Sequence, residues 1–271
     1  IMVVQHNLSA MNTNRQMGVV TNALQKSTEK LSSGYKINRA ADDAAGLSIS
    51  EKMRSQIRGL NKASDNAQDG ISLIQVAEGA LNETHSILQR MNELATQAAN
   101  DTNTSVDRQS IKDEIKQLNE ELDRISSTTQ FNKQDLLTGG FSGKLQVGAL
   151  EGQTMDVKIS LAVSAKGLKV SAVEVSTNAK AGAAMQSIQD AIESVSKQRS
   201  KLGAIQNRLE HTINNLDTNA ENTQAAESRI RDTDMADEMV QYSKNNILSQ
   251  AGQSMLTQAN QQTQGVLSLL Q

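Results

Sequence analysis

Residues 46–98 read GLSISEKMRSQIRGLNKASDNAQDGISLIQVAEGALNETHSILQRMNELATQA, and no proline interrupts them. Apolar residues recur along this segment at mostly alternating steps of three and four, which places them on one helix face and is typical of coiled coils. They are Ile57, Leu60, Ala67, Ile71, Ile74, Ala77, Leu81, Leu88, Met91, Ala95 and Ala98, and only Ser64 and Thr84 interrupt the series. A helix of about 52 residues is roughly 78 Å long, too long for a compact globular domain, so the pattern predicts an elongated rod.

The composition favours helix seams over a compact aromatic core. The 271 residues include no proline, cysteine or tryptophan, and only two phenylalanines and two tyrosines. Burial must therefore come from aliphatic side chains along long helices. The net charge of −3, with mixed signs, gives no electrostatic reason to expect nucleic acid or a membrane as a partner. The absence of cysteine excludes disulfides and thiolate catalysis.

Two further helices are predicted in the middle of the chain. Thr104 and Asp107 follow a turn and resemble a capping box that opens the first of them. Its apolar residues, at four-three spacing, are Ile111, Ile115, Leu118, Leu122 and Ile125. The short connection predicts that this helix runs antiparallel to the long one. From Ala181 the heptad returns as far as Leu216, which predicts a second long rod helix, also antiparallel to the first.

Residues 131–180 are predicted to form a small β-hairpin region. The helical period stops there, and β-branched residues alternate in three segments, 144–148, 155–159 and 168–175. Residues 151–153 and 165–167 supply the turns between them. We expect this region to cover the part of the long helix that the shorter second helix cannot reach.

The two ends of the chain share an unusual lack of charge. Residues 245–271 contain no charged side chain, and Arg15 is the only one among the first 25 residues. In a homopolymer every charge is repeated at each subunit, so a crowded interior favours neutral side chains. We therefore predict that the ends pair as helices and form one assembly module; the alternative is two disordered Gln- and Asn-rich tails. The candidate polymerisation residues are Val4, Leu8, Met11, Leu24, Leu31, Ile247, Leu248, Ala251, Met255, Leu256, Ala259, Val266 and Leu270.

The sequence offers little for catalysis. His6, His85 and His211 lie in separate segments, and none has a metal-ligand spacing. The carboxylate pairs at residues 42–43 and 120–121 are adjacent, so on a helix they point apart and indicate a solvated face. We expect a structural protein that is not an enzyme and uses no cofactor or metal.

Several long motifs resemble those of bacterial flagellins. They are QHNLSAMN (5–12), KLSSGYKINRAADDAAGL (30–47), QDGISLIQ (68–75), GAIQNRLEHTI (203–213), AESRIRD (226–232) and residues 250–270. The resemblance covers nearly the whole chain and is weakest at residues 145–180. It implies a terminal-helix domain of residues 1–33 and 235–271, spokes of residues 34–45 and 231–234, and a rod domain of residues 46–230 that includes the β region 131–180. The variable outer domains of the family are missing.

The resemblance also implies a function. Flagellins are secreted unfolded through the flagellar type III apparatus and polymerise, beneath a filament cap, into the extracellular filament that drives swimming motility. The implied partners are other copies of the chain in a helical homopolymer, a flagellin export chaperone on the C-terminal segment, the filament cap and hook-filament junction proteins. Two alternatives stay open: a hook-filament junction protein, and a coiled-coil signalling or adaptor protein.

A second, passive function is implied for one surface of the rod. Flagellins recognised by the vertebrate flagellin-sensing Toll-like receptor present a segment similar to residues 88–94 and a glutamate similar to Glu114. This chain keeps Arg90, Glu93, Leu94 and Glu114, whereas Asn92 stands where strong activators have arginine. On this interpretation Leu94 is an exposed apolar anchor. The alternative is that Arg90 and Glu93 form only a solvated pair one helical turn apart.

Overall fold

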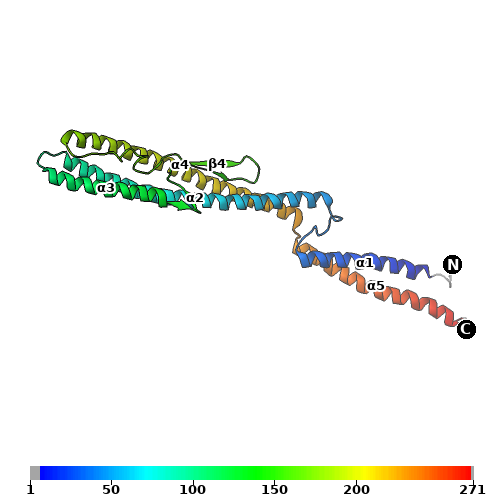
Figure 1. The fold of residues 1–271 in the computed structure, drawn as a ribbon. Coiled ribbons are helices and arrows are strands. Elements are labelled where there is room, and N and C mark those ends of the chain that lie inside the picture. Colours follow the sequence, from blue (N-terminus) through cyan, green and yellow to red (C-terminus); the bar gives the residue numbers. More distant parts are fainter. Residues whose placement is uncertain (1–6, 270–271) are drawn as a thin grey trace. The chain divides into compact units, whose positions relative to one another are not determined.

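The computed structural model describes residues 7–269, with side chains described as far as Gln262. Its helices are α1 (Leu8–Ser33), α2 (Ala44–Ala98), α3 (Ser105–Thr128), α4 (Asn178–Arg231) and α5 (Met235–Leu269). Its strands are β1 (Gln130–Phe131), β2 (Gln134–Asp135), β3 (Phe141–Gln146) and β4 (Thr154–Ile159) (Figure 1). The predicted mainly helical fold with a small β-hairpin region is confirmed.

The chain divides into two compact units. Residues 56–221 form one unit, called the bundle below, and residues 1–55 together with 222–271 form the other, called the terminal unit. The bundle contains α3, the strands and most of α2 and α4, which lie side by side in Figure 1. The domain and spoke boundaries expected from the resemblance stay predictions.

The bundle is built on α2 and α4, which run antiparallel as predicted. The Ser64 hydroxyl donates to the Asp217 carboxylate at 3.0 Å, and Arg199 pairs with Glu78 at 3.7 Å, so rising numbers on one helix meet falling numbers on the other. The predicted heptad positions supply the core. Fully buried residues of the two helices include Ile74, Leu81, Leu88, Met91, Ile188, Val195, Leu202 and Leu209.

Ser64 and Thr84, which interrupt the apolar series of α2, are both buried in the bundle. Ser64 bonds across to α4, and the Thr84 hydroxyl donates to the Ala80 carbonyl oxygen of its own helix at 2.9 Å. Because both hydroxyls have partners, their burial does not leave an unpaired polar group. The two interruptions are therefore compatible with a continuous seam.

Helix α3 begins with the predicted capping box. The Thr104 N–H donates to the Asp107 carboxylate at 2.9 Å, and the Asp107 N–H donates to the Thr104 hydroxyl oxygen at 3.3 Å. The Thr104 hydroxyl also donates to the Asp107 carboxylate. This bond, and to a smaller extent the bond from the Thr104 N–H, holds the pKa of Asp107 below its usual value. Beyond this start, Ile111, Ile115 and Leu122 are buried against the other helices.

Two antiparallel hairpins form the β region. In the first, β1 pairs with β2 around Asn132 and Lys133, whose φ angles of 48° and 63° are those of a tight two-residue turn. In the second, β3 pairs with β4 from Phe141↔Ile159 to Gln146↔Thr154. Alternate residues of β4, namely Met155, Val157 and Ile159, are buried, as the period of two predicts.

The prediction of a third strand at residues 168–175 is wrong, because this segment is an irregular loop. Its side chains do alternate, since Leu168 and Val170 are buried and Lys169 is exposed. Its backbone, however, bonds to α3 and to its own turn instead of to a strand. Asn119 of α3 donates to the Val170 carbonyl oxygen at 3.3 Å, and the Val170 N–H donates to the Ala165 carbonyl oxygen at 2.9 Å. An alternating pattern predicts which side chains are buried, but not which partner the backbone finds.

The second hairpin packs closely on α2 because glycines face it. A Cβ added at Gly59 would lie 2.9 Å from the Ala149 Cβ and 3.3 Å from the Ala149 Cα, whereas one added at Gly79 would meet nothing within 4 Å. Gly59 therefore permits a close approach that any side chain would prevent. Gly79 has no such role in this structure.

These two glycines of one helix give a matched test. We expect Gly79→Ala to raise the free energy of unfolding by about 0.5–1 kcal/mol, because alanine is the better helix former. Gly59→Ala should instead lower it by about 1 kcal/mol, since the loop at Ala149 must move away. Urea denaturation followed by circular dichroism measures both. Equal denaturation midpoints for the two variants would contradict the close approach.

Candidate interaction surfaces

The terminal unit contains the antiparallel pair α1 and α5. Met17 faces Gly252, with 3.8 Å between the Met17 Cγ and an added Cβ, and the Lys30 ammonium lies 3.4 Å from the Glu238 carboxylate. Half-buried or buried residues recur at three-four spacing on each helix. On α1 they are Ala10, Thr13, Met17, Val20, Leu24, Ser27 and Leu31; on α5 they are Glu238, Tyr242, Asn245, Ser249, Gly252, Leu256 and Ala259. Small and polar side chains thus make up just over half of this set, and its large apolar side chains are only half-buried.

Large apolar side chains lie on the outside of the same pair. Leu8 and Met11 of α1 are 69% and 64% exposed, and Ile247 and Met255 of α5 are 66% and 58% exposed. Val19, Met239, Val240 and Leu248 are exposed as well. We call this set the outer stripe. So many exposed apolar residues on one helix pair are typical of a surface that another protein covers.

The candidate polymerisation residues divide between these two surfaces. Leu24, Leu31, Leu256 and Ala259 are half-buried in the seam, whereas Leu8, Met11, Ile247, Leu248, Ala251 and Met255 are exposed. Val4 and Leu270 lie outside the described residues, and the side chain of Val266 is not among those described. The sequence pattern grouped all of them in one stripe because a heptad pattern does not say which of two neighbouring faces a partner helix covers.

The connector after α1 is bound to the junction of α4 and α5 within the terminal unit. The Lys36 N–H donates to the Arg231 carbonyl oxygen at 2.6 Å, and the Thr233 N–H donates to the Gly34 carbonyl oxygen at 3.0 Å. The Arg231 guanidinium also lies 4.7 Å from the centre of the Tyr35 ring, a cation–π contact. These bonds connect the segment after α1 to the segment between α4 and α5.

An exposed ion-pair cluster links α2 to α3 in the bundle. Arg90 donates to Glu114 from Nε at 3.0 Å and from Nη2 at 2.8 Å, and to Glu93 from Nη1 at 3.3 Å. The side chain of Arg90 is 52% exposed, and those of Glu93 and Glu114 are 69% and 44% exposed. We call these three residues the Arg90 patch. The hydrogen bonds to Glu114 have the largest effect on the Arg90 guanidinium; together with the bond to Glu93 they raise its pKa above the usual value.

Leu94 is not part of this surface, which corrects the expectation of an exposed apolar anchor. It is 2% exposed and belongs to the bundle core with Met91 and Ala95. A wide apolar face on α2 contacts both α3 and α4, so positions beside the predicted seam are buried as well. Arg90 lies one helical turn before Leu94, at the solvated edge of this face where it reaches Glu114 of α3, and Glu93 is exposed beside it.

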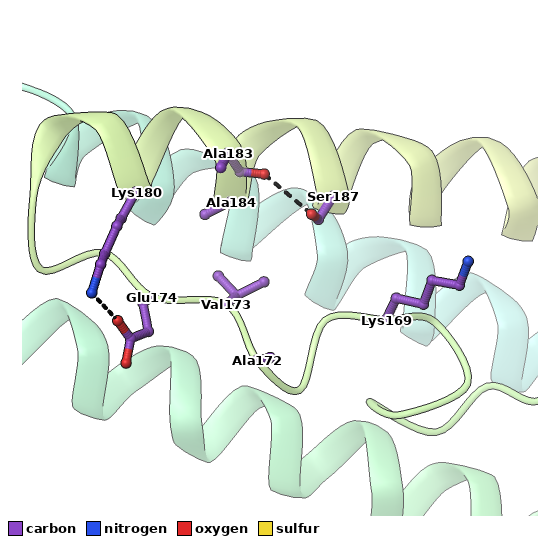
Figure 2. A pocket seen from close by; sticks show the side chains of 8 residues that line it. All are labelled: Lys169, Ala172, Val173, Glu174, Lys180, Ala183, Ala184 and Ser187. Carbon is purple, nitrogen blue, oxygen red and sulfur yellow. Dashed lines mark hydrogen bonds and ion pairs between the residues drawn. The ribbon is translucent and has the colours of Figure 1, made fainter.

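A shallow hollow lies between the loop at residues 169–174 and the start of α4 (Figure 2). Its volume is about 310 Å³, and it is lined by Lys169, Ala172, Val173, Glu174, Lys180, Ala183, Ala184 and Ser187. Lys180 is paired with Glu174, and the Ser187 hydroxyl donates to the Ala183 carbonyl oxygen at 3.1 Å. The hydroxyl of Ser187 thus donates to its own helix backbone and not to a base, as the hydroxyl of an activated nucleophile would.

The two histidines within the described residues, His85 and His211, lie on different helices, α2 and α4. The His85 Nε2 lies 3.0 Å from the Gln89 amide nitrogen, His211 is exposed on α4, and His6 lies outside the described residues. Among residues 7–269 no group of three or more His, Cys, Asp or Glu side chains could hold a metal ion. In the same part of the chain, no helix is long and apolar enough to cross a membrane.

The long helices with their aliphatic core define a helical-bundle protein with two small hairpins. Residues 4–142 match the bacterial flagellin N-terminal helical region, and residues 185–270 match the bacterial flagellin C-terminal helical region. The chain belongs to the bacterial flagellin family, in a short form without variable outer domains.

Individual relatives agree with this assignment. The flagellin of Halalkalibacterium halodurans is 56% identical, with 99% of this chain and 100% of the relative covered. The flagellin of Bacillus subtilis is 51% identical over 99% of this chain and 100% of its own length. The crystal structure of Bacillus cereus flagellin is similar with a TM-score of 0.51 and 34% identity, covering 60% of this chain and 94% of that one. The chain is therefore a structural subunit that polymerises into the extracellular filament of the bacterial flagellum.

Replacing leucine by alanine at Leu94 and, separately, at an exposed position tests whether Leu94 is buried. We expect Leu94→Ala to lower the free energy of unfolding by about 2–5 kcal/mol, because it leaves a cavity in the core. Leu150→Ala is the control, since Leu150 is 67% exposed and should change stability little. Thermal unfolding of the monomer measures both. A Leu94→Ala variant as stable as the control would show that Leu94 is not buried.

Proposed function

We propose that the filament subunit is also a ligand of the vertebrate flagellin-sensing Toll-like receptor, through the Arg90 patch. The proposal is supported by the resemblance of residues 88–94 and Glu114 to the surface that this receptor recognises. It is also supported by geometry, because Arg90 is exposed while two carboxylates hold it in place. A side chain that is already ordered loses less entropy when a partner binds it.

In this proposal Leu94 does not contact the receptor, and it affects recognition only by stabilising α2. Because it is buried, replacing it would reduce recognition by disturbing α2, not by removing a contact. Asn92 is a better candidate for adjusting the strength of signalling. Its Oδ1 is buried without a hydrogen-bond partner among the described residues, and arginine occupies this position in strong activators. We expect Asn92→Arg to increase receptor signalling.

Arg90→Ala tests the receptor proposal directly. We expect the concentration for half-maximal signalling in a receptor reporter assay to rise at least about tenfold, because a central arginine often dominates an interface. Arg124→Ala is the matched control: Arg124 is an exposed arginine paired with Glu121 on α3, away from the patch. Equal signalling by the Arg90→Ala variant and the parent, at matched concentrations and with normal folding, would sink the proposal.

We further propose that the outer stripe contacts neighbouring subunits, and that α1 and α5 become fully ordered only in the filament. An isolated helix gains most of its stability by burying an apolar face, and the seam between α1 and α5 buries few large apolar side chains. Before assembly, the C-terminal part of the stripe is available to a flagellin export chaperone. The same ends would meet the filament cap and the hook-filament junction proteins.

Removing the charge-free tail separates assembly from folding. Deleting residues 245–271 should abolish polymerisation and leave the thermal transition of the bundle nearly unchanged. Placing aspartate at both Ile247 and Met255 should have the same effect, because it buries unpaired like charges at every subunit. Seeded polymerisation, scored by electron microscopy, measures assembly. Normal filaments from the deletion variant, or slow hydrogen exchange across residues 247–262 in the monomer, would contradict the proposal.

A further inference from the structure

The turn between β3 and β4, residues 148–153, presents one large apolar side chain on a rigid support. Gln146 donates from Nε2 to the carbonyl oxygens of Gly148 and Leu150 at 2.8 and 2.7 Å. The Leu150 N–H donates to the Gln153 Oε1 at 3.1 Å. Ala149 is held against Gly59 of α2, yet the neighbouring Leu150 is 67% exposed. A single exposed leucine is common, but one fixed on so well-bonded a turn is ready to bind a partner at low entropic cost.

The hollow of Figure 2 is the complementary feature. Val173, Ala172 and Ala184 form an apolar floor between the loop and α4, and Lys169 and the Lys180–Glu174 pair lie at its two ends. A volume of about 310 Å³ is enough for a leucine side chain. Among the described residues no carboxylate pairs with Lys169, and its φ of 59° marks the bend in the loop that places it at the edge.

The charges of the turn and the hollow are opposite. Beside Leu150 the turn carries Glu151, and residues 148–153 contain no basic residue, so its charge is −1. The hollow carries Lys169, Lys180 and Glu174, which gives two positive charges and one negative, or +1. An apolar side chain beside an acidic one therefore matches an apolar floor beside a free lysine. Such complementarity sets the register of a contact and disfavours wrong partners.

One copy of the chain cannot make this contact with itself. The turn contacts α2 at Gly59, whereas the start of α4 meets the other end of α2, where Asn178 donates to the Ala99 carbonyl oxygen. About 35 residues of α2 separate Gly59 from the part of α2 beside the hollow, which is roughly 50 Å along the bundle. Two different surfaces at opposite ends form a head-to-tail interface, and such interfaces generate open helical polymers when they do not close into rings.

We propose that Leu150 of one subunit inserts into the hollow of the next subunit along the filament, with Glu151 pairing to Lys169. The occupant is a second copy of this chain, because the chain polymerises and carries both complementary surfaces. This contact is separate from the outer stripe, since all its residues belong to the bundle. It would fix the axial register of the bundles while the chain ends join the subunits elsewhere.

Disulfide trapping tests the contact directly, because the chain has no cysteine of its own. Filaments of the Leu150→Cys/Ala183→Cys variant are grown from parent seeds and treated with a mild oxidant. We expect a ladder of covalent multimers on a denaturing gel, since each copy links to the next. The matched control is Leu150→Cys/Val76→Cys, in which the second cysteine is exposed on α2 away from the hollow and should give no ladder. Filaments of the first variant that form without crosslinks would overturn the proposal.

Charge exchange provides a second test that does not depend on oxidation. Glu151→Lys and Lys169→Glu, made singly, should each raise the monomer concentration needed for filament growth about tenfold, as loss of an interface contact does. The double variant should return close to the parent value, because the pair is restored with its charges reversed. If the cysteine variant does not assemble, the charge exchange tests the proposal alone. A double variant that needs as high a monomer concentration as the single variants would overturn the contact.

Discussion

The aliphatic seam between α2 and α4 is the contact on which the rest of the structure depends. With so few aromatic residues, the chain buries its apolar surface mainly through aliphatic side chains. Leu81, Leu88 and Leu202 are completely buried there, and each such side chain contributes about 1.5–3 kcal/mol when it leaves water. Helix α3 has 24 residues against 55 in α2, so it covers only part of the seam, and the hairpins and the loop cover more.

Polar side chains then set how the covering elements lie on this seam. Asn66 of α2 donates to the Gln146 carbonyl oxygen at 3.1 Å, and Gln198 of α4 donates to the Lys158 carbonyl oxygen at 3.3 Å. Both bonds reach backbone carbonyl groups of the second hairpin. Apolar packing alone tolerates small shifts, whereas these bonds favour one position. The rigid presentation of Leu150 follows from this arrangement.

The two units differ in how much of their apolar surface one copy of the chain can bury. The bundle completes its core within the monomer. The α1 and α5 pair uses small and polar side chains at its seam and leaves residues such as Met11 and Ile247 exposed. This division agrees with the proposed role of the outer stripe, because the monomer can fold without covering the surfaces that we propose to contact neighbouring subunits. The absence of charge in residues 245–271 would lower the desolvation penalty of such a contact.

The sequence by itself determined the helices, the antiparallel seam and the capping box at Thr104, because these depend on spacings within one segment. It also predicted an assembly role for the ends, which stays a prediction, and the resemblance implied an exposed patch at Arg90, Glu93 and Glu114, whose exposure the structure confirms. Only the tertiary structure decided that Leu94 is core, that residues 168–175 form a loop, and which residues of the ends face outward. Each of these depends on a partner element that periodicity does not specify: α3 and α4 beside Leu94, Asn119 beside the loop, and α5 beside α1. A repeat in the sequence gives the direction of a side chain, whereas its burial depends on what the fold places in front of it.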